Sequence, residues 1–128
     1  MAGWDDVRRL ALALPDVTER AGENPQWLVR GKGFVWDRPL RRADHEALGA
    51  AAPTGPVLGA WVADLGVKEA LIADDAAVFF TTPHFDGYRA VLVRLDDIAV
   101  DELAEVVEGA WLARAPKRLA ATYLEARP

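Results

Sequence analysis

Apolar residues near the start of the chain recur at intervals of three or four positions, which is the spacing of one face of an α-helix. The residues concerned are Trp4, Val7, Leu10, Ala11 and Leu14. Two acids, Asp5 and Asp6, suit the first turn of this helix, because carboxylates interact favourably with the N-terminal end of a helix dipole. We expect Pro15 to end the helix, because proline cannot continue the backbone hydrogen-bond ladder.

Shorter apolar runs, bounded by glycine, proline and acidic residues, predict five β-strands. They cover residues 26–30, 33–37, 57–63, 77–81 and 90–95. Gly31 and Lys32 join the first two strands, and a glycine at the first central position is typical of a type II′ hairpin turn. The sequence therefore predicts an antiparallel hairpin early in the sheet.

Helical spacing or helix-end signals recur in four later segments. They cover residues 43–51, 64–73 and 100–111, and the chain from residue 116 onward. Asp44 is a candidate cap for the first of them, and Asp64 has the residue type and position of an N-cap for the second. Pro116 stands where a new helix would begin, a position that proline favours.

The predicted order of elements is α-β-β-(α)-β-α-β-β-α-α. Strands and helices do not alternate strictly and a hairpin opens the sheet, which favours an α+β fold over a parallel α/β fold. We expect two layers, with an antiparallel five-stranded sheet covered by helices on one face. No repeat, linker or low-complexity tract divides the chain, so residues 1–128 are expected to form one domain.

Composition removes several classes of chemistry. The chain of 128 residues has no cysteine, and its sequence also contains no serine, which excludes cysteine and serine nucleophiles, disulfides and thiolate metal ligands. Its two histidines, His45 and His84, are too few for a usual zinc site. His45 stands between two acids, and we interpret it as a solvated residue. We therefore expect a protein that is not an enzyme and that holds no metal and no cofactor.

The distribution of charged and apolar residues also indicates where in the cell the protein is expected. Asp5 and Asp6 stand where a signal peptide would carry positive charge. The longest uncharged run, residues 47–63, contains two prolines and three glycines, which is typical of a turn and a strand and not of a membrane span. We therefore expect a cytoplasmic protein with no membrane association. The sequence does not specify an oligomeric state.

Charge is distributed unevenly along a chain whose net charge is −5. Residues 30–42 contain five basic side chains and one acid, Asp37. Residues 96–108 contain six acids and no base, and we interpret the acids of 101–108 as the solvated face of a helix. The overall negative charge opposes non-specific binding of nucleic acid unless the basic residues gather on one surface.

Five short segments carry a family resemblance. The most specific is Val78-Phe79-Phe80-Thr81-Thr82-Pro83-His84-Phe85-Asp86-Gly87-Tyr88, a strand followed by a loop. The others are Gly31-Lys32-Gly33-Phe34, Val91-Leu92-Val93-Arg94-Leu95, Ala110-Trp111 and Ala115-Pro116-Lys117-Arg118. Together they resemble the MmcQ/YjbR-like family over nearly the whole chain.

The resemblance implies a two-layer fold of helix, three strands, helix, two strands and helix, likened to type III secretion chaperones. This order agrees with the one predicted from the hydrophobic pattern. Proteins of this family are generally labelled uncharacterised or DNA-binding, the second label resting on fold-level analogy to winged DNA-binding proteins. The resemblance therefore implies a small binding module with DNA as its expected partner.

The nucleic-acid hypothesis depends on basic residues in and around the first hairpin. Their side chains would contact phosphate oxygens, and two more at the start of the last helix would extend the surface. The candidates are Arg30, Lys32, Arg38, Arg41, Arg42, Lys117 and Arg118. The chain has one asparagine and one glutamine, both outside the predicted helices, so binding would be weakly sequence-selective. Alternatively, these charges only keep a sheet edge from pairing with other chains.

The loop of residues 82–88 supports a second hypothesis, that the protein is a chaperone-like module that binds a peptide or a small ligand. Loops held between strands commonly carry binding residues. The candidates are Thr82, His84, Asp86 and Tyr88. Alternatively the loop is structural, with Pro83 and Gly87 shaping the connection while His84 and Tyr88 bond to the backbone.

Overall fold

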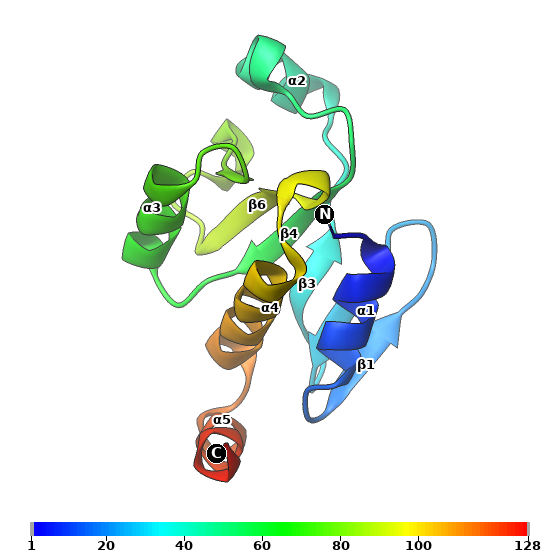
Figure 1. The fold of residues 1–128 in the computed structure, drawn as a ribbon, viewed down its shortest axis with the longest axis vertical. Helices are drawn as coiled ribbons and strands as arrows, with labels where there is room; N and C mark the ends of the chain where they lie inside the picture. The colour runs from blue at the N-terminus through cyan, green and yellow to red at the C-terminus, as the bar shows by residue number, and fades with distance from the viewer. Residues whose placement is uncertain (1, 128) are drawn as a thin grey trace.

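The computed structural model describes residues 2–127, within which it contains five helices, six strands and three short 3-10 turns. The helices are α1 (Trp4–Leu12), α2 (Arg42–Leu48), α3 (Leu65–Asp74), α4 (Val100–Arg114) and α5 (Lys117–Ala126). The strands are β1 (Val17–Arg20), β2 (Gln26–Val29), β3 (Lys32–Asp37), β4 (Val57–Trp61), β5 (Phe79–Phe80) and β6 (Ala90–Arg94). The turns are η1 (Gly49–Ala51), η2 (Pro83–Phe85) and η3 (Leu95–Asp97). Figure 1 views the sheet from the side on which α1 and α4 cross it.

The strands form one sheet in the order β1-β2-β3-β4-β6-β5, and every neighbouring pair is antiparallel. The predicted α+β fold with an antiparallel sheet is confirmed, but the predicted number of five strands is wrong. The strand missing from the prediction is β1, whose sequence Val-Thr-Glu-Arg has a single apolar residue. Its half-buried Glu19 is held by a hydrogen bond of 2.9 Å from the indole Nε1 of Trp27. A polar side chain thus occupies the inward position that strand prediction assigns to an apolar one.

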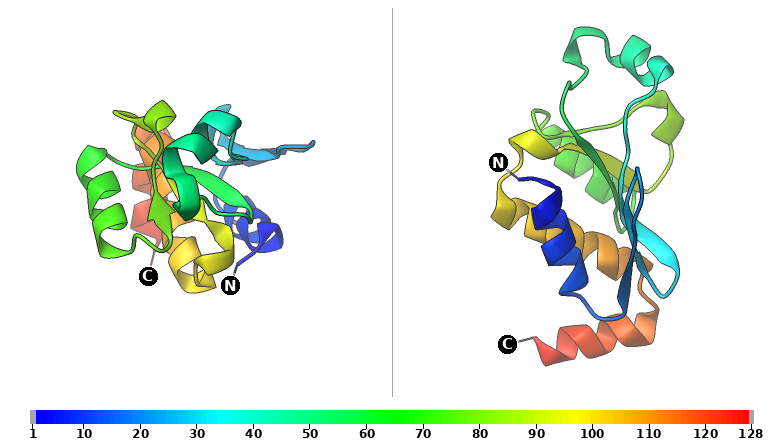
Figure 2. Two further views of the ribbon diagram at one scale, coloured as in Figure 1. Left: turned by 90° about the horizontal axis from the view of Figure 1, so that it is seen from above. Right: turned by 90° about the vertical axis from the view of Figure 1, so that its right-hand side faces the viewer.

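The main hydrophobic core lies between the sheet and the helices α1, α3 and α4 (Figure 2). Alternate residues of the strands point into it, as the two-residue period of a strand requires. A smaller core lies on the opposite face of the sheet. It consists of Val57, Phe80, Phe85, Ala90 and Leu92, with Trp36, Leu40 and Leu48 packed against it. The second face is thus partly covered as well, by α2 and by η2.

The turn between β2 and β3 differs from the predicted type. Val29 pairs with Lys32, so the two central residues are Arg30 and Gly31, with φ of 47° and 83°. Two left-handed residues make a type I′ turn, whereas a type II′ turn would need Gly31 in the first central position. Arg30 is held in this conformation by Asp16, whose carbonyl oxygen accepts from its backbone N–H at 3.3 Å and whose carboxylate pairs with its Nε at 2.8 Å.

The predicted helix-end signals are partly confirmed. The carboxylate of Asp64 accepts from the backbone N–H of Val67 at 2.9 Å, so Asp64 is the N-cap of α3 as predicted. Asp44 also caps its helix, but from the third position of α2: its carboxylate accepts from the backbone N–H of Arg41, the N-cap residue, at 2.8 Å. Within residues 2–127, no helix combines the length and hydropathy that a membrane crossing needs.

Candidate functional site: the Arg41 cleft

The strand β3 separates the predicted basic residues into two groups. Arg30 and Lys32 lie at its start, and Arg38, Arg41 and Arg42 follow its end. A strand of six residues is about 20 Å long, so residues 30–42 do not form one surface. In Figure 1 the end of β3 leads toward α2 at the top, whereas α5 lies at the bottom.

Four of the seven basic candidates are brought to the end of the molecule where β3 begins: Arg30, Lys32, Lys117 and Arg118. Arg114, the last residue of α4, donates from its Nε to the carbonyl oxygen of Gly33 at 3.2 Å. This bond ties the junction of α4 and α5 to the start of β3, and Figure 2 shows both segments at the same end of the molecule. Arg30 is paired with Asp16 there, whereas Lys32, Lys117 and Arg118 are exposed. We call this group the basic end.

Two of the remaining candidates are paired with acids close by in sequence. Arg42 forms an ion pair of 3.4 Å with Glu46, one helical turn further along α2, and its side chain is 94% exposed. Arg38 is buried and forms an ion pair of 3.1 Å with Asp44. Arg38 cannot contact a phosphate without giving up its buried partner. Arg42 keeps its Nη groups exposed, but it lies at the opposite end of β3 from Lys32.

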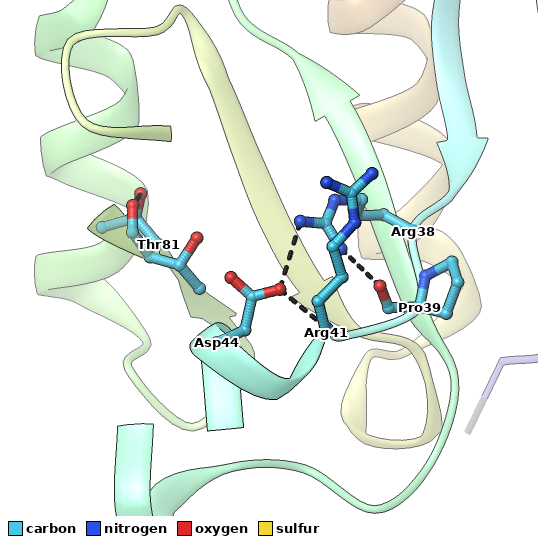
Figure 3. A network of polar contacts seen from close by, with 6 residues as sticks. Arg38, Pro39, Arg41, Asp44 and Thr81 are labelled. Carbon is cyan, nitrogen blue, oxygen red and sulfur yellow. Dashed lines mark hydrogen bonds and ion pairs between the residues drawn. The ribbon is translucent and has the colours of Figure 1, made fainter. Parts of the chain in front are cut away.

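Arg38 is the central side chain of a buried polar network (Figure 3). Its Nη2 donates to Asp44, its Nη1 donates to the carbonyl oxygen of Pro39, and its guanidinium carbon lies 5.2 Å from the centre of the Phe85 ring. Burial alone would raise the pKa of Asp44, but the N–H of Arg41 and the charge and hydrogen bond of Arg38 outweigh it, and the pKa is lowered. The Asp44 carboxylate therefore stays ionised and holds both Arg38 and the backbone of Arg41.

A cleft of about 570 Å³ opens beside this network. We call it the Arg41 cleft, and its polar and aromatic lining includes Gln26, Trp36, Arg38, Arg41, His84 and Phe85. Asn24 and Asp37 line it too, and the Nδ2 of Asn24 donates to the Asp37 carboxylate at 3.2 Å. Its volume lies in the range of small-molecule sites, which are roughly 300–1,000 Å³.

Aromatic rings line one part of the Arg41 cleft. The rings of Trp36 and Phe85 are 6.5 Å apart, and the ring of His84 meets that of Phe85 edge-on at 4.8 Å. Trp36 lies against Gly59 of the neighbouring strand, where a Cβ atom would stand 2.3 Å from the indole. Trp36 can therefore occupy this place only because residue 59 has no side chain.

Arg41 is the cationic side chain of the cleft that has no acid of its own. It is exposed, and among residues 2–127 its guanidinium forms no ion pair. In Figure 3 its side chain extends toward the region of the Arg38 guanidinium, and both line the cleft. The carboxylates nearest to these guanidinium groups are already bonded, that of Asp44 to Arg38 and that of Asp37 to Asn24. The Arg41 guanidinium therefore keeps its donors available to a bound anion.

The four candidate residues of the predicted ligand loop do not face one common site. His84 lines the Arg41 cleft, whereas Asp86 lines a different depression beside Lys68, and Tyr88 is 52% exposed. Thr82 is buried, and its Oγ1 has no hydrogen-bond partner within the described part of the chain. His84 and Asp86 therefore do not act together in one cleft. Across residues 2–127 no three side chains of the His, Asp and Glu types come together as metal ligands.

Lys68 was not predicted as a site residue, yet its side chain holds the loop of residues 82–88 in place. This residue of α3 is 5% exposed, and its Nζ donates to the carbonyl oxygens of Phe85 at 2.7 Å and Tyr88 at 3.0 Å. Burial lowers the pKa of Lys68, and the charge of Asp86 partly opposes this shift. The spacing of Lys68, Leu71 and Ile72 places the lysine on the apolar face of its helix, which could have indicated that it is buried. A buried lysine needs polar partners, so this spacing could also have indicated a structural role.

Comparison with known proteins relates the chain as a whole to one family. A family model described as YjbR matches residues 12–113. Uncharacterized proteins of Mycobacterium bovis and Mycobacterium tuberculosis are 51% identical over 127 residues, which is 97% of this chain and 97% of each relative.

A solved structure is similar in fold. The crystal structure of a Deinococcus radiodurans protein, described with the family-model domain DUF419, aligns with a TM-score of 0.63 and 18% sequence identity. The alignment covers 88% of this chain and 78% of the other. At this identity the likeness is one of fold.

Proposed function

This chain belongs to the YjbR family, and we propose that it is a non-enzymatic binding module whose Arg41 cleft holds a small organic anion with a planar ring. The observation that carries the proposal is the unpaired guanidinium of Arg41 in a cleft that Trp36 and Phe85 also line. Carboxylate and phosphate are the anionic groups that a guanidinium binds through two parallel hydrogen bonds.

The charge of the cleft supports an anionic ligand group. Arg38 and Asp44 neutralise one another, and the carboxylate of Asp37, which keeps its charge, accepts a hydrogen bond from Asn24 and not from Arg41. The Arg41 guanidinium remains as the strongest donor available to a ligand. Because the chain as a whole carries a net charge of −5, attraction to the anion is local and is weakened by salt.

The aromatic lining supports a planar ring in the ligand. Trp36 is half-buried and presents part of its ring to the cleft, and the edge-on His84 adds a second aromatic wall. Gln26 supplies an amide that donates or accepts a hydrogen bond. A ring stacked between such groups, with its acid group on Arg41, would satisfy both parts of the lining.

The test is a titration with phenyl phosphate, benzoate and the neutral benzyl alcohol, followed by calorimetry and by backbone amide shifts in NMR. We expect the two anions to bind at the cleft and the alcohol to bind far more weakly. Arg41→Gln should weaken anion binding by roughly tenfold to a hundredfold, because charge-assisted hydrogen bonds are lost.

Arg42→Gln is the matched control for this experiment. It removes the same charge one residue further along, from a side chain that is 94% exposed and paired with Glu46. Anion binding should be unchanged in this variant. Equal losses from Arg41→Gln and Arg42→Gln, or equal affinity for the anions and the alcohol, would contradict the proposal.

DNA binding is a second candidate function, and the basic end supports it. Lys32, Lys117 and Arg118 are exposed, and Arg114 ties their two segments to one another. Such a group would make sequence-independent contacts to phosphates. It would involve the hairpin turn and the start of α5, and it would not involve Arg38, Arg41 or Arg42.

A further inference from the structure

A second hollow lies on the other side of the sheet from the Arg41 cleft, between α3 and α4. We call it the α3–α4 groove. Its volume is about 430 Å³. Trp61 and Phe79 of the sheet form its floor, Val67 and Leu71 line it from α3, and α4 forms the opposite wall.

The groove exists because α3 and α4 pack on different strands. α4 packs on β3 and β4, and α3 packs on β5 at the far edge of the sheet. The wall from α4 also carries small residues, Gly109, Ala110 and Ala113. A Cβ atom at Gly109 would meet no other atom within 4 Å. The space is therefore open to a ligand, and no side chain of the described chain fills it at that point.

The groove is apolar except at one end. Its charged lining residues are Glu102 and Glu105, which lie toward the start of α4, whereas Leu112 and Ala113 line it toward the end of that helix. The separation from residue 102 to residue 113 along α4 is about 16 Å. Neither glutamate forms an ion pair within residues 2–127.

The two glutamates also lie in a locally negative environment. Burial raises the pKa of Glu102, and the charges of Asp75, Asp101 and Glu105 raise it further. Positive charge close to these carboxylates would relieve their mutual repulsion. The opposite end of the groove is different, because the guanidinium of Arg114 already lies 4.3 Å from the centre of the Trp61 ring.

From the shape and the charge of this groove, we infer that it is a binding site for a small hydrophobic amine. The apolar body of the ligand lies along Trp61, Phe79 and Leu71, and its ammonium group lies between Glu102 and Glu105. The volume suits one drug-sized molecule and is too small for a protein segment of several turns. This site is independent of the Arg41 cleft, which takes ligands of the opposite charge.

The experiment compares three probes of one shape: phenylbutylamine, phenylbutanol and phenylbutyrate. Binding is followed by backbone amide shifts of α3, α4 and β4 in the full chain. We expect the amine to bind best, the alcohol more weakly and the carboxylate least. Added salt should weaken binding of the amine and leave that of the alcohol unchanged.

Two variants separate shape from charge. Gly109→Leu places a side chain in the open space and should reduce the affinity for the amine at least tenfold, while its replacement of a helical glycine favours folding. Glu105→Gln should weaken binding of the amine by roughly two- to fivefold, the size of a partly exposed ion pair, without affecting the alcohol. Glu125→Gln and Ala121→Leu, both on α5 and outside the groove, are the matched controls.

Several outcomes would overturn the inference. Equal affinity for the amine and the carboxylate, or full binding of the amine by Gly109→Leu, would each do so. A protein that sediments as a dimer, and as a monomer once Gly109→Leu is introduced, would show that a second copy of the chain occupies the groove instead. If Glu125→Gln weakened binding of the amine as much as Glu105→Gln does, the effect would be one of general surface charge and the inference would be wrong.

Discussion

The ammonium nitrogen of Lys68 lies 2.7 Å from the backbone carbonyl oxygen of Phe85 and donates a hydrogen bond to it. A buried side chain of α3 thereby holds the residue whose ring lines the Arg41 cleft and lies beside the Arg38 guanidinium. The geometry of the cleft thus depends on a contact from a helix on the far edge of the sheet.

Replacing Lys68 with methionine should both destabilise the protein and make the Phe85 side of the Arg41 cleft more mobile. The carbonyl oxygens of Phe85 and Tyr88 lose their donor, at a cost of about 1–3 kcal/mol in the free energy of unfolding. Urea denaturation measures this cost, and the shift of the Phe85 ring resonances in NMR measures the loosening. Glu69→Gln, an exposed neighbour, should change neither quantity.

The buried position of Lys68 predicts how the stability of the protein changes at alkaline pH. Burial lowers its pKa below the ordinary value of 10.5. Between the lowered value and 10.5, the unfolded chain binds more protons at this residue than the folded protein does, so this residue contributes increasing stability as the pH rises. The difference in unfolding free energy between the parent protein and Lys68→Met should therefore increase with pH across that interval. A constant difference would contradict the prediction.

Replacing Asp44 with asparagine should be one of the most destabilising single changes in the chain. It leaves the buried Arg38 without its carboxylate, which costs about 3–5 kcal/mol for a buried ion pair. Because the pKa of Asp44 is lowered from 3.8, its contribution is complete above that pH and is lost as the pH falls through the lowered value. Urea denaturation of the parent protein and the variant should therefore converge in strong acid.

The control for Asp44 is Glu46→Gln on the same helix. Glu46 pairs with Arg42, but both side chains are exposed, so the loss should be below about 0.5 kcal/mol. A loss from Glu46→Gln as large as that from Asp44→Asn would contradict the difference in burial on which both expectations rest.

Arg30→Gly should leave stability nearly unchanged, within about 0.5 kcal/mol. Glycine adopts the left-handed conformation of this residue freely, and that gain offsets the exposed ion pair with Asp16. Arg30→Val should instead cost roughly 1–2 kcal/mol, because a β-branched residue is strained at positive φ. Thermal unfolding of the two variants checks the contrast, and equal melting temperatures would refute it.

If the basic end binds DNA, Lys32→Glu combined with Lys117→Glu should abolish binding of a short duplex at low salt. Binding by the parent protein should fall steeply as salt is raised, since phosphate contacts release counterions. Arg42→Glu, at the other end of β3, should leave it intact. Fluorescence anisotropy with a labelled duplex measures all three, and binding that is insensitive to salt would exclude this mode.

The sequence pattern predicted the structure correctly where a residue's role depends on residues a few positions away in the chain. The helix α4 follows from its apolar spacing, and the cap at Asp64 follows from contact with a residue three positions away. The strand β1 and the turn at Arg30 could not be predicted in this way. Glu19 depends on Trp27 of the next strand, and Arg30 depends on Asp16, fourteen positions earlier.

The candidate site illustrates the same limit. Arg38, Arg41 and His84 were identified from residue type, but the sequence did not show that Arg38 would be buried against Asp44 while Arg41 stayed free. Nor did it show that β3 separates Arg41 from Lys32. Lys68 escaped prediction because its partners are backbone carbonyl oxygens, which any sequence provides.

The shape of the Arg41 cleft depends on the absence of a side chain at Gly59. Residue 59 is not among the lining residues, yet a single methyl group added there would push against the Trp36 indole from the adjoining strand. Affinity could thus be tuned by mutation at a site that no ligand touches, and a search for relatives with altered specificity should compare this position as well as those that face the ligand.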